Sequence, residues 1–365
     1  MKSIIYLQLL LALLGLASWR SYTSKKLAPT SPKNIILMIG DGMGLAQISA
    51  SIYNQGTSTI FEKFPVVGLQ KTTSSDNLIT DSAAAATAMA CGKKTFNNAI
   101  GLDSAECSCK TILEEASEKG FATGLVATSS IVHATPAAFI SHVKARNYYE
   151  EIAEGFLKSN LDFFIGGGRQ FFYRRDKDNR NLITELSNQG FAIYDYFNDE
   201  LNRVTPSPAK RFGFFTADNQ PLPSSQGRDY LPLAAKMAIK YLPARSPKGF
   251  FLMIEGSQID WAGHANQAYP LLDEMKDFEI TITKMVEFAK KDGETLLIVT
   301  GDHEAGGASI NEGSAMKKLN VKFTTNGHTG TMIPVFAYGP GAELFRGIYD
   351  NTEIYYKMKQ SVGWQ

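Results

Sequence analysis

Residues 34–44 have the sequence Asn-Ile-Ile-Leu-Met-Ile-Gly-Asp-Gly-Met-Gly. The apolar run 34–39 shows no polar alternation, which is typical of a β-strand buried on both faces of a sheet. It runs directly into Gly40-Asp41-Gly42, so a carboxylate follows the carboxyl end of the predicted strand. In open α/β sheets, ligands bind beyond the carboxyl ends of the strands.

Five more apolar runs share these features, and they span residues 122–127, 161–165, 250–254, 296–299 and 333–338. Helical patterns lie between them at 110–119, 229–241 and 268–290. Alternating strands and helices predict an α/β fold, with a mostly parallel central sheet flanked by helices on both faces. The more polar stretch 171–225 is predicted to be a peripheral elaboration.

The composition bounds the class of protein. The chain has 365 residues, 44% of them hydrophobic, which is enough for a large core. We expect one domain over residues 33–365. Lys and Arg number 37 and Asp and Glu number 36, which gives a net charge of +1. This balance excludes bulk electrostatic binding to nucleic acid or to an anionic membrane as the main function.

The N-terminus has the features of a targeting segment. Lys2 precedes an apolar run over residues 4–17, which ends in Gly15-Leu16-Ala17. These features predict a secretory signal peptide over residues 1–17, followed by a disordered leader over residues 18–32. The alternative is a membrane anchor, but the run is shorter than the roughly 20 apolar residues of a span. We expect a periplasmic or secreted protein without a stable membrane span after signal removal.

The cysteines and one histidine are assigned structural roles. In an exported protein, Cys91 is expected to form a disulfide with Cys107 or Cys109. A metal site at the two neighbouring thiols is the weaker alternative, because no third ligand is nearby. His142 is predicted to be a structural residue on a helix.

Side chains that can bind metal ions follow four of the predicted strands. They are Asp41, then Thr135, then Glu255 with Asp260 and His264, and then Asp302 with His303. Carboxyl ends of parallel strands meet at one edge, so we expect these side chains to converge. The alternative is that each of these residues only forms a turn or caps a helix. This role would explain a single polar residue after a strand, but it explains less easily why such residues follow four strands.

The chemistry of these residues predicts two kinds of metal site. Asp260 and His264 are four residues apart and share one face of a helical turn. His328 lies in a glycine-flanked loop. Carboxylate and imidazole together suit zinc. Ligands that offer only oxygen suit magnesium, and the candidates are Asp41, Thr135 and Glu255.

Ser82 begins an alanine-rich helical segment. Its simplest role is to cap the helix. A helix N-terminus also attracts anions through its free N–H groups. No Ser-His-Asp order is evident, so a nucleophilic Ser82 would need activation by a metal ion.

The motifs together resemble alkaline phosphatase in order and spacing, over roughly residues 33–360. They are Asp41-Gly42-Met43-Gly44, Asp81-Ser82-Ala83, His133-Ala134-Thr135-Pro136, the Arg146 segment, Glu255 with Asp260 and His264, Asp302-His303, and Gly327-His328-Thr329-Gly330.

The resemblance implies a role for each site residue. Ser82 is the nucleophile that becomes phosphoserine, and Arg146 clamps the phosphate. The implied cofactors are two Zn2+ and one Mg2+. Their implied ligand sets are Asp260, His264 and His328 for one zinc, Asp41, Asp302 and His303 for the other, and Asp41, Thr135 and Glu255 for magnesium.

Two positions depart from the best-known enteric bacterial enzyme of this family. His133 replaces an aspartate and Trp261 replaces a lysine, and both are expected to contact substrate and to affect magnesium binding and phosphate release. The segment between His303 and His328 is short, so the accessory crown region of the family should be minimal. The resemblance also implies a homodimer.

The expected function is hydrolysis of small-molecule phosphate monoesters through a phosphoserine. The alternatives are a phosphodiesterase or sulfatase of the same superfamily, and a non-catalytic protein that binds metal or phosphate. Arg146 favours a monoester, because a second ester group would remove an oxygen that the guanidinium could bind.

Overall fold

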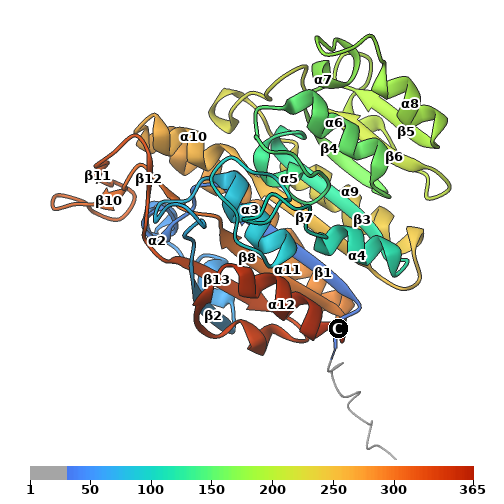
Figure 1. Cartoon of the computed structure of the whole chain (residues 1–365). Coiled ribbons are helices and arrows are strands. Elements are labelled where there is room, and N and C mark those ends of the chain that lie inside the picture. Colours follow the sequence, from blue (N-terminus) through green and yellow to red (C-terminus); the bar gives the residue numbers. More distant parts are fainter. Residues whose placement is uncertain (1–30) are drawn as a thin grey trace, which may run out of the picture.

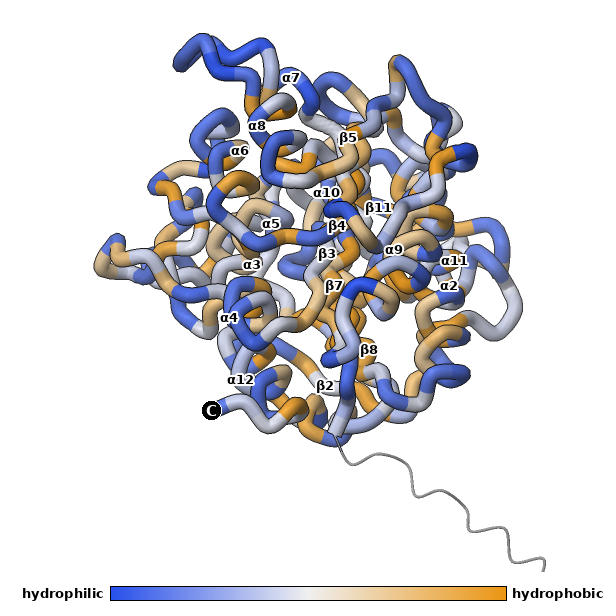
Figure 2. Tube along the Cα trace, turned by 90° about the vertical axis from the view of Figure 1, so that its right-hand side faces the viewer, coloured by the Kyte–Doolittle hydropathy of each residue, from blue (hydrophilic) through white to orange (hydrophobic). Residues whose placement is uncertain are grey.

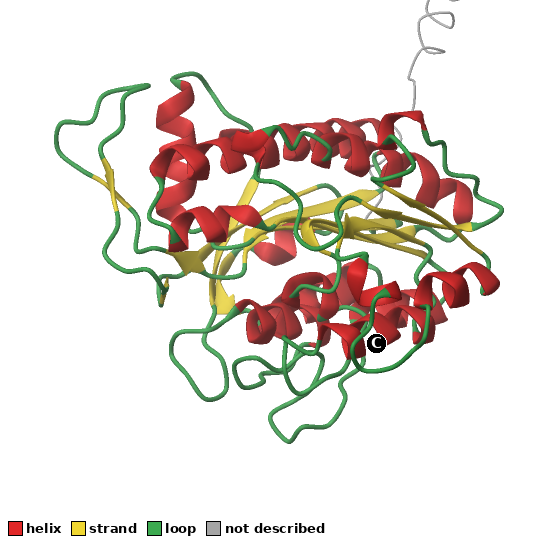
Figure 3. Ribbon diagram, turned by 90° about the horizontal axis from the view of Figure 1, so that it is seen from above, coloured by secondary structure: helices red, strands yellow, loops and turns green. Residues whose placement is uncertain are grey.

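The computed structural model describes residues 31–365, so the predicted signal peptide and residues 18–30 of the leader lie outside the described residues. A ten-stranded sheet lies between two layers of helices (Figure 3). Its strands lie in the order β14-β2-β13-β8-β1-β7-β3-β4-β6-β5. β13 is antiparallel to both of its neighbours and the other pairs are parallel, which confirms the predicted mostly parallel sheet.

The strands of the main sheet have the following bounds: β1 (Asn34–Gly40), β2 (Val66–Lys71), β3 (Ala122–Ser130), β4 (Phe163–Gly167), β5 (Phe191–Asp195), β6 (Arg211–Phe215), β7 (Phe250–Gly256), β8 (Thr295–Gly301), β13 (Ile333–Tyr338) and β14 (Gly347–Asp350).

Each face of the sheet has its own hydrophobic core, as the alternation along β1 shows. Ile35, Leu37 and Ile39 pack into one core, and Ile36 and Met38 pack into the other. Figure 2 shows hydrophobic residues along the inner strands β3, β7 and β8. Burial on both faces explains why these strands lack polar alternation.

The helices divide between the two faces. One face is covered by α2 (Leu45–Gln55), α9 (Leu231–Arg245), α10 (Gln258–His264) and α11 (Ala268–Asp292). The other face is covered by α3 (Ser82–Cys91), α4 (Ile112–Glu118), α5 (Ala134–Ala137), α6 (Tyr149–Lys158), α7 (Gln170–Tyr173), α8 (Leu182–Asn188) and α12 (Thr352–Ser361).

Three local expectations need correction. The stretch 171–225 lies at the sheet edge, but it also adds β5 and β6 to the main sheet. The helix that contains Pro136 spans only Ala134–Ala137, so His142 lies in a loop, where its imidazole contacts the Gly101 carbonyl and the Glu114 carboxylate. All three cysteines are free thiols, and Cys91 donates a hydrogen bond to the Cys109 carbonyl instead of forming the expected disulfide.

The segment between His303 and His328 is small, as expected. It contains β9 (Glu304–Ala305), β10 (Ser309–Ile310) and β11 (Val321–Lys322), and β9 pairs with β12 (His328–Thr329). Figure 1 shows this region projecting beside α2 and α10. Within residues 31–365, no helix has the length and apolar character needed to cross a membrane.

Truncation of a core aromatic side chain should lower stability strongly. Phe164 is fully buried, and its ring lies 5.2–5.9 Å from the rings of Phe156, Phe191 and Phe215. We expect Phe164→Ala to lower the free energy of unfolding by about 3–5 kcal/mol, because it leaves a cavity. Urea denaturation would measure this loss. The control is Phe197→Ala, whose side chain is 80% exposed. Equal effects of the two substitutions would contradict the assignment of this core.

Candidate active site

Four adjacent central strands, in the order β8-β1-β7-β3, deliver polar side chains to one edge of the sheet. Gly40 at the end of β1 pairs with Gly301 of β8 and with Gly256 of β7. Glu255 lies near the end of β7, and the other predicted residues follow the ends of their strands. These are Asp41 after β1, Asp302 and His303 after β8, and His133 and Thr135 after β3. The structure therefore brings these predicted residues to one place.

Glycines allow the segments that carry the candidate ligands to approach closely. Gly42 adopts a φ of +72°, and a Cβ there would lie 2.7 Å from the Asp260 Cα. A Cβ on Gly263 would lie 2.9 Å from the Ala305 Cβ. Because neither position has room for a side chain, α10 packs directly against the loops after β1 and β8.

The first ligand cluster consists of Asp260, His264 and His328. The Asp260 Oδ1 lies 3.3 Å from the His264 Nε2 and 3.4 Å from the His328 Nε2, and the two Nε2 atoms are 3.1 Å apart. Each Nδ1 contacts a backbone carbonyl, that of Asn326 for His264 and that of Thr80 for His328. Such contacts fix the ring orientation of metal-binding histidines and leave Nε2 free for the ion.

The second cluster surrounds Ser82, the first residue of α3. The Ser82 Oγ lies 3.2 Å from the His303 Nε2 and 3.4 Å from the Asp41 Oδ1. The same His303 nitrogen lies 3.3 Å from both the Asp41 Oδ1 and the Asp302 Oδ2. The carboxylate of Asp260 reaches this cluster as well. One hydroxyl is thus held within a group of buried metal-type ligands.

The third cluster contains Asp41, Glu255 and His133. Thr135, the predicted oxygen ligand, is fully buried, and its hydroxyl has no hydrogen-bond partner in the described structure. His133 was expected to contact substrate and to affect magnesium binding, and the structure places its imidazole among these candidate ligands. Burial and the positive charge of Arg146 lower the pKa of His133 to about 3, so its imidazole is neutral and can act as a ligand.

The three clusters concentrate negative charge away from water. Asp41, Glu255, Asp260 and Asp302 are each 5% exposed or less. Burial, followed by repulsion from Asp302 and Asp260, raises the pKa of Asp41 well above its usual value, and burial raises the pKa of Glu255 to about 7. Buried charges of one sign are costly without compensation, and bound cations supply it.

Unsatisfied hydrogen-bond acceptors also indicate that cations bind in these clusters. Among the described residues, the Asp260 Oδ1, Asp302 Oδ2 and Glu255 Oε1 are buried without a hydrogen-bond partner. Native proteins rarely leave such atoms unsatisfied. Together with the imidazole nitrogens of the three clusters, these carboxylate oxygens form a set of ligands that suits divalent metal ions.

Arg146 lies beside the nucleophile candidate. Its Nη1 donates to the Asp81 Oδ2 at 3.0 Å, and its Nη2 lies 3.4 Å from the His133 Nε2. Asp81 also caps α3, since its other oxygen accepts from the Ala84 amide at 3.0 Å. Asp81 was not among the predicted site residues, although its position directly before Ser82 is the signal for such a role. Trp261 packs edge-on against His133.

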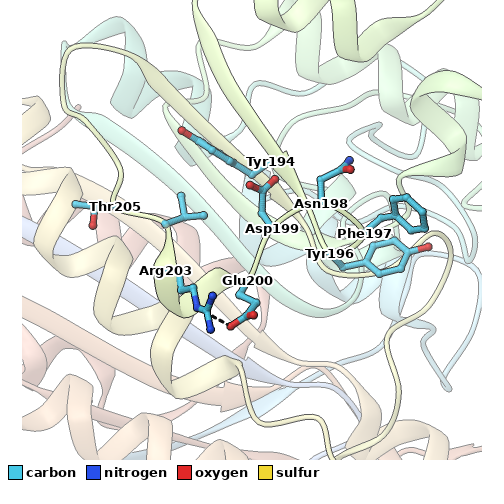
Figure 4. Close-up of a pocket in the computed structure, with 9 residues that line it drawn as sticks. Tyr194, Tyr196, Phe197, Asn198, Asp199, Glu200, Arg203 and Thr205 are labelled. Atoms are coloured by element: carbon cyan, nitrogen blue, oxygen red, sulfur yellow. Dashed lines mark ion pairs between the residues drawn. The ribbon is translucent and has the colours of Figure 1, made fainter.

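A separate cavity of about 520 Å3 lies at the end of the edge strand β5 (Figure 4). Aromatic and polar side chains line it, including Tyr194, Tyr196 and Phe197. None of the described residues that line it belongs to the three ligand clusters. The central strand ends therefore remain the candidate site.

The charge of His264 predicts how the affinity of the first ligand cluster for a metal ion such as zinc depends on pH. The Asp260 carboxylate, 3.3 Å away, raises the pKa of His264 from 6.5 to about 9. In the metal-free protein this pairing stabilises the fold fully below about pH 6.5, and the contribution is lost as pH rises through about 9. Zinc needs the neutral imidazole, so the zinc affinity should increase up to about pH 9.

Competition with a chromophoric chelator at several pH values would measure this increase in affinity. The His264→Gln variant lacks the titrating group, so its zinc affinity should change less steeply with pH. Parallel pH profiles for the wild type and the variant would contradict the prediction.

Comparisons with known proteins identify relatives over most of the chain. A family model described as alkaline phosphatase matches residues 32–319 and 308–363. Alkaline phosphatase 3 of Bacillus subtilis is 37% identical, with 88% of this chain and 87% of that protein covered. Alkaline phosphatase of Escherichia coli is 31% identical, with 91% and 86% covered.

A solved structure of an alkaline phosphatase also resembles this chain. Alkaline phosphatase from the Antarctic bacterium TAB5 superimposes with a TM-score of 0.86 at 43% identity, covering 92% of this chain and 99% of that chain. The chain described here therefore belongs to the alkaline phosphatase family.

Proposed function

We propose that this protein hydrolyses phosphate monoesters to an alcohol and inorganic phosphate, with Ser82 as the nucleophile. The supporting observation is the position of the Ser82 hydroxyl, which lies 3.2 Å from His303 and 3.4 Å from Asp41 at the start of α3. Free N–H groups at a helix start attract anions, so a phosphoryl group placed there would face the nucleophile.

The cofactors in this proposal are two Zn2+ and one Mg2+. Asp260, His264 and His328 would hold one zinc, and Asp41, Asp302 and His303 would hold the other. Asp41, Thr135 and Glu255 would hold magnesium. A relative supports a magnesium site, since a histidine-to-aspartate mutant of the Antarctic enzyme has Mg bound in its M3 site. Bound divalent ions would neutralise phosphoryl charge and lower the pKa of the attacking hydroxyl and water.

The reaction proceeds in two displacements in this proposal. Ser82 loses its proton and its Oγ forms a bond to phosphorus, while the ester P–O bond breaks and the alcohol leaves with a proton from solvent. A water molecule then attacks the phosphoserine, the P–Oγ bond breaks, and Ser82 recovers its proton. Each step needs positioning and charge neutralisation rather than further covalent chemistry.

Arg146 supplies the preference for monoesters. Its guanidinium is held by Asp81, which keeps it beside Ser82. A guanidinium fork can bind two phosphoryl oxygens at once. A diester offers one fewer free oxygen, so Arg146 favours this activity over the phosphodiesterase alternative. The ligand clusters around an intact Ser82 also favour catalysis over simple metal or phosphate binding.

Export and domain organisation also belong to this proposal. The apolar run 4–17 after Lys2 supports a cleaved signal peptide and a periplasmic or secreted enzyme. Residues 33–365 would form one catalytic domain, supported by the single ten-stranded sheet. The homodimer that the family resemblance implies stays a prediction.

Substitution of the nucleophile tests the proposal directly. We expect Ser82→Ala to abolish the acid-stable phosphoenzyme and nearly all turnover of p-nitrophenyl phosphate, while zinc content stays close to wild type. Labelling with radioactive phosphate would detect the phosphoserine. Ser141→Ala is the matched control, because Ser141 is also buried, at 4% exposure, but lies outside the clusters. A Ser82→Ala enzyme with wild-type rates would refute the proposal.

Arg146 should discriminate between substrates. We expect Arg146→Met to lower kcat/KM for p-nitrophenyl phosphate by about 100-fold, as loss of a charge-stabilising donor does. The effect on the bis-ester should be much smaller. The control is Arg169→Met, since Arg169 forms a similar ion pair with Asp195 at 2.9 Å away from the clusters. Equal losses on both esters would contradict a role in monoester recognition.

A further inference from the structure

Among residues 307–332, only the partly buried Phe323 packs against a hydrophobic core, so the segment that carries His328 is weakly anchored. Residues 307–332 include no buried residue, although His328 lies within them and contributes to the first ligand cluster. The pairing between β9 and β12 extends over only two residue pairs, His328 with Ala305 and Thr329 with Glu304. So short a ladder is marginal by itself. Other contacts must hold His328 in place.

The carboxylate of Glu304 accepts four hydrogen bonds in this region. Its Oε1 accepts from the Gln47 Nε2 at 2.7 Å and from the Ala308 amide at 2.9 Å. Its Oε2 accepts from the Thr329 hydroxyl at 2.5 Å and from the Gly307 amide at 3.1 Å. Glu304 is 3% exposed, and all four donors are uncharged. A buried carboxylate without a neutralising cation depends on such a complete set of donors.

These contacts join three segments that carry candidate ligands. Glu304 itself follows Asp302-His303. Gln47 lies in α2, directly after the Asp41 loop, and is fixed in turn by the Gly44 amide and the Ala305 carbonyl. Thr329 follows His328 in β12. Gly44 makes room for the arrangement, since a Cβ there would lie 2.4 Å from the Glu304 Cγ.

We propose that Glu304 is a positioning residue that holds His328 in the first ligand cluster and so sets its affinity for zinc. This inference rests on the proposed function, because it assumes that Asp260, His264 and His328 bind a metal ion. Glu304 does not touch that cluster. It acts by fixing the backbone of β12, so that the His328 Nε2 faces Asp260 before the ion arrives.

Glu304→Gln is the informative substitution, because it keeps the shape of the side chain. Each carboxylate oxygen accepts two hydrogen bonds, so the amide nitrogen would face two donors in either orientation. We expect zinc affinity at the first cluster to fall by about tenfold or more, as loss of outer-sphere support typically causes. Stepwise competition between metal-free protein and a chromophoric chelator would measure this affinity without relying on turnover.

Glu279→Gln separates positioning from general destabilisation. Glu279 lies in α11, is 6% exposed and also accepts hydrogen bonds only from uncharged groups, those of Ser51, Gln55 and Ile60. Urea denaturation should show both variants to be less stable than wild type. Zinc affinity should fall in Glu304→Gln alone.

The outcomes distinguish this inference from the proposed function. Wild-type zinc affinity in a folded Glu304→Gln protein would overturn the role of Glu304 and leave the phosphatase proposal intact. Equal losses of zinc affinity in both variants would also overturn it, because the effect would then follow stability alone. Wild-type protein that bound no zinc would overturn both proposals.

Discussion

Repulsion among buried carboxylates is the constraint on which the rest of the site depends. Asp41, Glu255, Asp260 and Asp302 meet at the ends of central strands with almost no access to water. Imidazole groups and one guanidinium offset part of this charge, but three carboxylate oxygens still lack a hydrogen-bond partner among the described residues. The paired strands fix the backbone that carries these side chains, and the surrounding fold offsets the cost of burying them.

The parallel sheet turns distant segments of sequence into neighbours. β8, β1, β7 and β3 lie side by side, so their carboxyl ends bring ligands together from positions 41 to 303. α3 then brings Ser82 to the same edge from one helical layer, and α10 brings Asp260 and His264 from the other. The chemistry of the site follows from this convergence more than from any single motif.

The central part of this arrangement could be predicted from sequence because its physical signals are local. Continuous apolar runs marked the buried strands, and side chains that can bind metal ions after four of these strands marked the site. The edge strand β5 was missed, since it is short and four of its five residues are only partly buried. Its neighbour β6 is mostly buried, but it is also short and its apolar run is interrupted by Gly213. The place of His133 among the ligands, the double role of Asp81 and the contacts of Glu304 depend on tertiary proximity, which spacing along the chain does not reveal.

The role proposed for Ser82 requires that the buried carboxylates and histidines enclose divalent cations around its hydroxyl. Anomalous diffraction from crystals of the purified enzyme, recorded on both sides of the zinc absorption edge, tests it most directly. We expect two zinc peaks, one among Asp260, His264 and His328 and one that contacts Asp41, Asp302, His303 and the Ser82 oxygen. A fully zinc-exchanged enzyme with no anomalous peak near Ser82 would contradict it.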